Sequence, residues 1–244
     1  MAERHVLRTP EEVAAEAAEY ITTLAEERVR TRGRFTVALA GGSTPRRLYE
    51  TLASPPYVKR LTWERWVVFW GDERCVPPDH RESNYLMAKE ALLDRVPVPE
   101  SNVHRMRGEA PPPEAAEEYQ RVLRRIFGES TPSIDLVLLG LGSDGHTASL
   151  FPGTDALREE QQLVVANWIP QLEAYRLTFT LPLLNAAGEV AFLVTGESKA
   201  AVVQQVLQPA EGASAPPAAL VQPASGRLLW FLSKAAASRL SYQG

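Results

Sequence analysis

The chain has 244 residues, of which 45% are hydrophobic and 23% are charged, and its formal net charge at pH 7 is −4. These proportions are ordinary for a globular protein and exclude a wholly disordered or collagen-like chain. The small excess of acidic residues excludes a generally basic surface that would neutralise a phosphate backbone, so we expect no nucleic acid partner.

The sequence contains no sign of a membrane or secreted protein. No apolar run approaches the roughly 18 residues of a membrane span, so we expect no membrane partner. The N-terminus begins with charged residues and lacks the apolar core of a signal peptide, and Cys75, the one cysteine, has no partner for an internal disulfide. We therefore expect a cytoplasmic protein, and because no repeat or central linker divides the chain, a single domain over residues 1–244.

The first predicted helix begins with a capping signature. Thr9 can accept hydrogen bonds from free backbone N–H groups, Pro10 suits the first helical position, and Glu12 completes a capping box. Apolar residues then recur at helical spacing until Gly33 ends the helix. The almost wholly apolar run from Phe35 to Ala40 follows, and it predicts a strand buried on both faces.

Strands and helices alternate along the rest of the chain. Gly41 to Pro45 breaks the first strand and starts a helix that Thr44 would cap. Further strands are predicted at Trp66 to Trp70, Asp135 to Leu139, Leu163 to Ala166, Arg176 to Leu181, Val190 to Val194 and Leu228 to Phe231, and further helices from Ser83 through Leu93, through Tyr119 and Ile126, at Ser198 to Leu207 and at Ser233 to Leu240. This alternation predicts an α/β fold with an open, mostly parallel sheet and helices on both faces. Pro209 to Gly226, rich in Ala, Pro, Ser and Gly, is interpreted as a surface loop.

Four predicted strands are followed directly by polar residues that can carry chemistry. These segments are GGST at 41–44, GDER at 71–74, GLGSDGH at 140–146 and TGESK at 195–199. In open α/β sheets, ligands bind in the crevice at the carboxyl ends of the strands. We therefore expect the four segments to meet at one site.

Two of the segments suit an anion. The residues Gly41 to Thr44 offer backbone N–H groups, two hydroxyls and the positive end of a helix dipole, although a tight strand-to-helix turn explains them equally well. No Gly-Lys-Ser/Thr follows, which excludes a nucleoside triphosphate loop. Lys199 lies at the start of a predicted helix, where a bound phosphate would relieve its conflict with the helix dipole; the alternative is a solvated surface lysine.

Asp144-Gly145-His146 is the best catalytic candidate in the chain. The imidazole of His146 could take a proton from water, and the carboxylate of Asp144 could orient the ring and stabilise the imidazolium. The alternative is a loop histidine with a structural hydrogen bond. Residues 140–145 also match GxGxxG, but a dinucleotide site is disfavoured because Asp144 would stand where the pyrophosphate approaches. The other three histidines share no metal-ligand spacing with His146 or with one another, so we expect no metal site.

Asp72, Glu73 and Arg74 are predicted to end a strand that is otherwise apolar. Arg74 could clamp an anionic oxygen with its planar guanidinium, and the two acids could hold Arg74 or a sugar hydroxyl. An ion-paired strand end is an equally good interpretation. The neighbouring Cys75 has no base evident in the sequence and is interpreted as inert packing.

These segments resemble a known family. ALAGGSTPRRLYE, WGDERCVP followed by ESNY, LGLGSDGHTASLFPG and VTGESKA occur in the order and spacing of the 6-phosphogluconolactonases, a branch of the sugar-phosphate isomerase and deaminase superfamily. The resemblance runs from about Leu39 through the C-terminal predicted helix. It implies hydrolysis of 6-phospho-D-glucono-1,5-lactone to 6-phosphogluconate in the oxidative pentose phosphate pathway, without metal or cofactor.

The resemblance also implies roles for individual residues. It makes His146 the base that activates water, with Asp144 beside it. It assigns binding of the phosphate and nearby oxygens of the substrate to Gly42, Ser43, Thr44, Asp72, Arg74 and Lys199. Ser233 stands where similar sequences often have Asp, a difference that we expect to concern a helix cap, since serine also caps well.

Two other functions stay open. An amino-sugar phosphate deaminase or isomerase of the same superfamily shares GGSTP and the DGH loop but uses an additional carboxylate soon after the histidine, whereas Thr147 to Gly153 contains no acid. A non-catalytic sugar-phosphate sensor would carry a DNA-binding module, and the chain before Phe35 contains only one clear helix. Release of ammonia or formation of a ketose would identify the first, and binding of 6-phosphogluconate without turnover of the lactone would identify the second.

Overall fold

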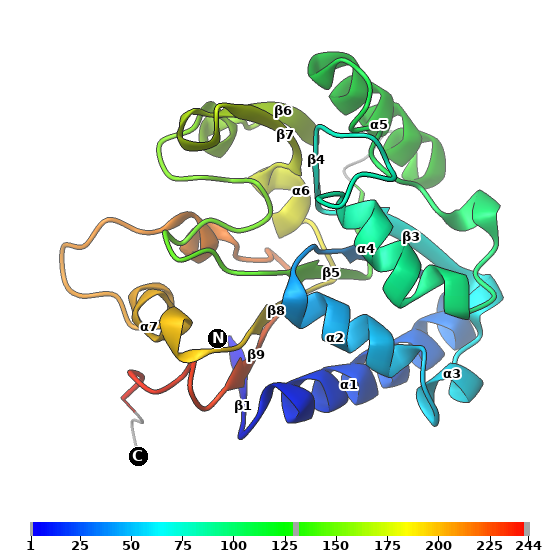
Figure 1. Cartoon of the computed structure of the whole chain (residues 1–244), viewed down its shortest axis with the longest axis horizontal. Helices are drawn as coiled ribbons and strands as arrows, with labels where there is room; N and C mark the ends of the chain where they lie inside the picture. Colours follow the sequence, from blue (N-terminus) through cyan, green and yellow to red (C-terminus); the bar gives the residue numbers. More distant parts are fainter. Residues whose placement is uncertain (1, 129–131, 242–244) are drawn as a thin grey trace.

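The computed structural model describes residues 2–128 and 132–241. Within these residues, the larger sheet has six strands in the order β1-β9-β8-β5-β2-β3, and all neighbouring strands in it are parallel (Figure 1). Its strands are β1 (Glu3–Leu7), β2 (Phe35–Leu39), β3 (Trp66–Trp70), β5 (Leu136–Leu139), β8 (Glu189–Val194) and β9 (Arg227–Ser233). The predicted mostly parallel sheet is therefore confirmed.

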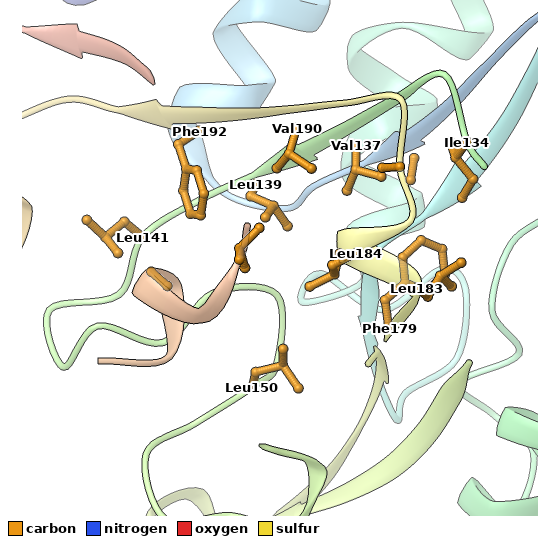
Figure 2. Packing of buried hydrophobic residues seen from close by; sticks show 14 of the residues in the cluster. Ile134, Val137, Leu139, Leu141, Leu150, Phe179, Leu183, Leu184, Val190 and Phe192 are labelled. Atoms are coloured by element: carbon orange, nitrogen blue, oxygen red, sulfur yellow. The ribbon is translucent and has the colours of Figure 1, made fainter. Parts of the chain in front are cut away.

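Helices cover both faces of this sheet, as the sequence predicts. One face packs against α1 (Pro10–Arg32), α2 (Ser43–Leu52) and α4 (Asn84–Ala91), with the short α3 (Tyr57–Arg60) beside them, and the other against α5 (Pro112–Phe127), α6 (Leu181–Asn185) and α7 (Ala200–Leu207). The buried residues form one core cluster on each face of the sheet. Along β5, Leu136 and Leu138 belong to the first cluster, on the side of α1, α2 and α4, whereas Val137 and Leu139 belong to the second, on the side of α5, α6 and α7. Figure 2 shows part of the second cluster, where residues of β5 and β8 face Leu183 and Leu184 of α6. This alternation explains why strands apolar on both faces indicate a two-sided sheet.

Three strands form a second sheet that the sequence analysis did not separate from the first. β4 (Asp72–Arg74), β7 (Ala174–Phe179) and β6 (Val164–Ile169) are antiparallel, in the order β4-β7-β6. The prediction that Asp72 to Arg74 end the strand before them is wrong, because β3 stops at Trp70 and a new strand starts after Gly71. Only residues 170–173 connect β6 to β7, and so short a connection permits only an antiparallel pair.

Both ends of the described chain differ from the prediction. The sequence analysis missed β1, which pairs with β9 at the edge of the larger sheet. The predicted helix from Ser233 to Leu240 is wrong, because β9 continues to Ser233 and residues 234–239 form turns. Ser233 still has a capping role: its Oγ accepts hydrogen bonds from the N–H groups of Ala236, at 3.2 Å, and Gly196, at 3.1 Å.

The predicted surface loop from Pro209 to Gly226 has two parts. Residues 209–215 are exposed. Pro217 and Ala218, in contrast, are buried within a short 3₁₀ helix, η7 (Pro217–Leu220). The start of α1 agrees with the prediction, since Thr9 Oγ1 accepts a hydrogen bond from the N–H of Glu12 at 3.2 Å. None of the helices that the structure describes is both long and apolar enough to cross a membrane.

Candidate active site

The loops at the carboxyl ends of β2, β3, β5 and β8 enclose a cleft of about 480 Å³. The cleft lies at the switch point of the sheet, between β2 and β5, where the direction in which strands are added reverses. From β2 the chain adds β3 on one side, and from β5 it adds β8 on the other. The structure thus brings the four polar segments together, as expected. Of the candidate site residues, Gly42, Ser43, Thr44, Asp72, Arg74, His146 and Lys199 line the cleft. Asp144 contacts His146 and is not itself part of the lining.

His146 and Asp144 form a hydrogen-bonded pair. Asp144 Oδ1 lies 2.6 Å from His146 Nδ1 and accepts a second hydrogen bond, of 3.1 Å, from the backbone N–H of His146. Partial burial acts to raise the pKa of Asp144, but the hydrogen bonds and the charge of His146 outweigh burial and hold this pKa below its usual value. Because an ionised carboxylate only accepts hydrogen bonds, Nδ1 carries the proton and Nε2 of the neutral ring can accept one.

The glycines around this pair let the loop close on itself. A Cβ on Gly142 would lie 2.1 Å from His146 Nδ1 and 2.6 Å from Asp144 Oδ1, so only glycine fits there. Gly145 adopts φ +82°, a left-handed conformation that favours glycine. Residues 140–153 form turns and not a helix, so the loop lacks the helix N-terminus that would bind a pyrophosphate. The GxGxxG match is therefore explained by the geometry of the His146–Asp144 pair.

The segment after β2 differs from the prediction in its cap. Helix α2 begins at Ser43, and the residue before it, Gly42 with φ 103°, occupies the N-cap position without a side-chain cap. The prediction that Thr44 caps this helix is wrong, because Gly42, two residues before Thr44, occupies the N-cap position. Thr44 Oγ1 instead lies 2.9 Å from Thr195 Oγ1 and joins the segment after β2 to the segment after β8. Among the residues that the structure describes, none caps the first N–H groups of α2 with its side chain, and these groups can bind a ligand.

Asp72 is held in place by two residues that the sequence analysis did not single out. Asn84 Nδ2 donates to the carbonyl oxygen of Asp72 at 2.9 Å and to Oδ1 at 3.3 Å, and Ser149 Oγ donates to Oδ2 at 2.7 Å. A Cβ on Gly41 would lie 1.8 Å from Asn84 Oδ1, so this position also requires glycine. Their signal in the sequence was only proximity to the motifs: Asn84 lies in ESNY and Ser149 follows the DGH loop.

Three cationic side chains line the cleft: Arg74, Lys199 and Arg176, of which the sequence analysis missed Arg176 as a site residue. The pairing of β4 with β7 places Arg176 directly opposite Arg74. Burial, and then repulsion from Arg74, lower the pKa of Arg176 from its ordinary value. In the described ranges 2–128 and 132–241, no acidic side chain lies within 4.0 Å of these three cations. The cleft is therefore suited to an anion.

Glu73 of the GDER segment and the neighbouring Cys75 have structural roles. Glu73 is buried, and its carboxylate accepts hydrogen bonds from Ser83 Oγ, at 3.0 Å, and from the N–H groups of Asn84 and Tyr85 at the start of α4, at 2.7 and 2.8 Å. Burial raises the pKa of the Cys75 thiol to about 11, so the thiol stays protonated, in accord with inert packing. Among the described residues, no three His, Cys, Asp or Glu side chains gather as metal ligands.

Comparisons with known proteins agree on one family. The family of glucosamine-6-phosphate isomerases and 6-phosphogluconolactonases matches residues 8–230. The chain is 42% identical over 240 residues to 6-phosphogluconolactonase of Rattus norvegicus, covering 97% of this chain and 93% of that protein. It is 44% identical over 225 residues to 6-phosphogluconolactonase of Synechocystis, covering 90% of each. The solved 6-phosphogluconolactonase of Trypanosoma cruzi matches with TM-score 0.89 and 31% identity, over 99% of this chain and 98% of that one.

The α/β fold and its cleft at the switch point of the sheet thus belong with enzymes of sugar phosphates. The chain is a member of the glucosamine-6-phosphate isomerase/6-phosphogluconolactonase family. Within the family, the relatives described above carry the lactonase name, in agreement with the resemblance of the four sequence segments.

Proposed function

We propose that this chain hydrolyses 6-phospho-D-glucono-1,5-lactone to 6-phospho-D-gluconate. One observation carries the proposal: a single cleft is lined by His146, which is hydrogen-bonded to Asp144, and by three cations without acidic partners at salt-bridge distance among the described residues. A phosphorylated sugar lactone offers a dianion to the cations and an ester carbonyl to a water molecule activated by His146. The 42% and 44% identities to lactonases support this choice of substrate.

His146 acts on the water molecule. Its Nε2 accepts a proton as the water oxygen attacks C1 of the lactone, and ionised Asp144 stabilises the resulting imidazolium. Negative charge develops on the carbonyl oxygen, where cations of the cleft stabilise it. When the carbonyl re-forms, the bond between C1 and the ring oxygen breaks, and the imidazolium donates its proton to that oxygen. The ring opens to the free acid, and neutral His146 is restored.

The rest of the cleft binds the substrate. The free N–H groups at Gly42, Ser43 and Thr44, together with Lys199, bind phosphate oxygens. Arg74 and Arg176 lie opposite each other and bind nearby anionic oxygens of the substrate and of the transition state. Asp72, which Asn84 and Ser149 hold from two sides, accepts a hydrogen bond from a sugar hydroxyl.

The acids of the cleft support hydrolysis over deamination or isomerisation. Among the described residues that line the cleft, Asp72 is the only acidic one. Moving a proton between carbons calls for an additional carboxylate close to the histidine, and Thr147 to Gly153 contains none. The product acid belongs to the oxidative pentose phosphate pathway, and we propose a cytoplasmic location for the enzyme, to which the unpaired Cys75 is suited.

The test is hydrolysis of freshly generated 6-phosphogluconolactone, corrected for its spontaneous hydrolysis, by the wild type and by His146→Ala. We expect the wild type to exceed the background rate and the variant to lose at least about 10²-fold in kcat, the usual contribution of a general base. The thermal unfolding midpoint of the variant should stay close to that of the wild type, since His146 is partly exposed. Near-normal turnover by His146→Ala would reject the role of His146, and a wild type no faster than background would reject the function.

A further inference from the structure

The loop that carries Asp144 and His146 rests against a distant part of the chain. The N–H of Ala218 donates a hydrogen bond of 3.0 Å to the carbonyl oxygen of Gly145. A Cβ added to Gly145 would lie 2.4 Å from Pro216 Cβ, so Pro216 packs directly on the α-carbon of Gly145. The residue between the two proposed catalytic side chains is thus contacted at its carbonyl and at its α-carbon.

Gly145 is also the residue on which the loop turns. Its N–H donates to the carbonyl oxygen of Gly142 at 3.1 Å, and the N–H of Gly142 donates to the carbonyl oxygen of His146 at 2.8 Å. Gly145 is buried, whereas the neighbouring Asp144 is exposed. A shift of Gly145 therefore moves the carboxylate of Asp144 relative to the imidazole of His146.

The contacting segment, Pro216 to Ala218, is firmly anchored. The N–H of Ala219 donates to the carbonyl oxygen of Pro216 at 2.8 Å. Ala218 belongs to the same core cluster as Leu141 and Leu150, which flank the catalytic loop. In Figure 2 this short helical turn, in pale orange, lies beside the green loop that follows Leu141. The preceding residues 209–215 are exposed, so the anchoring begins at the residues that contact Gly145.

We propose that Pro216 and Ala218 are positioning residues that keep the carboxylate of Asp144 on His146 Nδ1. The proposal rests on the proposed function, because it requires His146 to act as the base. Neither Pro216 nor Ala218 lines the cleft. Loss of this support therefore affects proton transfer and leaves substrate binding unchanged, which separates kcat from KM.

The test compares three variants in the lactone assay. Pro216→Gly removes the Cβ that packs on Gly145 and frees the backbone. Pro216→Ala keeps that Cβ but also loses the ring that fixes φ, and Ala215→Gly adds the freedom of glycine at the exposed neighbouring position. We expect Pro216→Gly to lower kcat about tenfold with KM within about twofold of wild type, because small displacements of catalytic groups are costly. Pro216→Ala and Ala215→Gly should stay within about twofold of wild type in both constants.

A pH profile separates positioning from a merely structural role. In Pro216→Gly, the imidazolium loses part of its carboxylate partner, so its proton leaves more readily and the acid limb of kcat moves to lower pH. An unchanged kcat and acid limb in this variant, an equal loss in Ala215→Gly, or an effect on KM alone would overturn the proposal. A wild type that does not hydrolyse the lactone would instead reject the proposed function itself.

A second pair of variants tests the contact between Pro216 and Gly145 directly. Gly145→Ala places a Cβ against Pro216 and should lower kcat. Removing the Pro216 side chain makes room for that Cβ, so Gly145→Ala/Pro216→Gly should have a higher kcat than Gly145→Ala alone. Such non-additivity is expected for residues in contact and not for distant, independent residues. Additive losses in the double variant would contradict the proposed contact.

Discussion

Asp144 determines which nitrogen of His146 carries the proton. Its carboxylate lies 2.6 Å from Nδ1, and its pKa is held below the usual value by the hydrogen bonds from His146 against the opposing effect of burial. The carboxylate therefore accepts the hydrogen bond, and the shared proton stays on Nδ1. We therefore expect the reaction to depend on this carboxylate as well as on the imidazole.

Asp144→Asn tests this arrangement. An asparagine amide can donate to Nδ1, which leaves the proton on Nε2 and removes the base, so we expect kcat to fall by about 10²-fold or more. The measurement is kcat across pH 5 to 9 with freshly generated lactone. Asp155→Asn, in an exposed i,i+3 ion pair with Arg158, is the matched control and should not change kcat. A wild-type rate for Asp144→Asn would refute the role assigned to the carboxylate.

At this scale, the sequence predicts the residues whose chemistry is local to a motif. His146 and Asp144 are two residues apart, so their pairing can be inferred from the spacing alone. Arg176 could not be found in this way, because it meets Arg74 only through the pairing of β4 with β7. Asn84 and Ser149 were missed for the same reason, since each acts through Asp72 and not through a motif of its own.

At the scale of elements, the position of the GGST segment depends on the join between β2 and α2. Tyr49 is buried on α2, and its hydroxyl accepts a hydrogen bond of 2.9 Å from the N–H of Ala40 and donates one of 2.8 Å to the carbonyl oxygen of the same residue. Ala40 directly precedes the glycines of the GGST segment. The helix thereby fixes the end of the strand that presents this segment to the cleft.

Tyr49→Phe should weaken this join. Removal of the hydroxyl leaves the buried N–H and C=O of Ala40 without their side-chain partner, so we expect the free energy of unfolding to fall by about 1–3 kcal/mol. Urea denaturation monitored by tryptophan fluorescence measures the change. Tyr57→Phe is the control, because the Tyr57 hydroxyl is in a 3.3 Å exposed hydrogen bond and should contribute less than about 0.5 kcal/mol. Equal, small effects of the two substitutions would contradict the account of Tyr49.

The elements that the sequence predicted well are those with a strong local signal. The apolar runs of β2, β3, β5 and β8 and the capped α1 lie within a few residues of their predicted limits. β1 has too few apolar residues to predict a strand, and it exists because β9 provides a parallel partner. The C-terminal helix was wrong because β9 extends to Ser233, which leaves residues 234–239 too short for a stable helix.

At the scale of the whole molecule, the topology of the sheet creates the site. Four segments that span residues 41–199 meet because they follow parallel strands on both sides of the switch point. The chain has a net charge of −4, yet three cations concentrate in the cleft. The sequence predicted this meeting from the positions of the strand ends, but the antiparallel sheet that adds Arg176 depends on long-range strand pairing that local patterns do not specify.

The central claim is that these cations hold the phosphate while His146 acts on the lactone carbon. The most direct test is the ratio of kcat/KM for 6-phosphogluconolactone to that for the lactone without phosphate, measured for the wild type, Lys199→Ala and the exposed control Lys234→Ala. We predict a wild-type ratio of at least about 10², equivalent to two charge-assisted hydrogen bonds, a clearly smaller ratio for Lys199→Ala and an unchanged ratio for Lys234→Ala. Equal turnover of the two lactones by the wild type, or a ratio unaffected by loss of Lys199, would contradict the account.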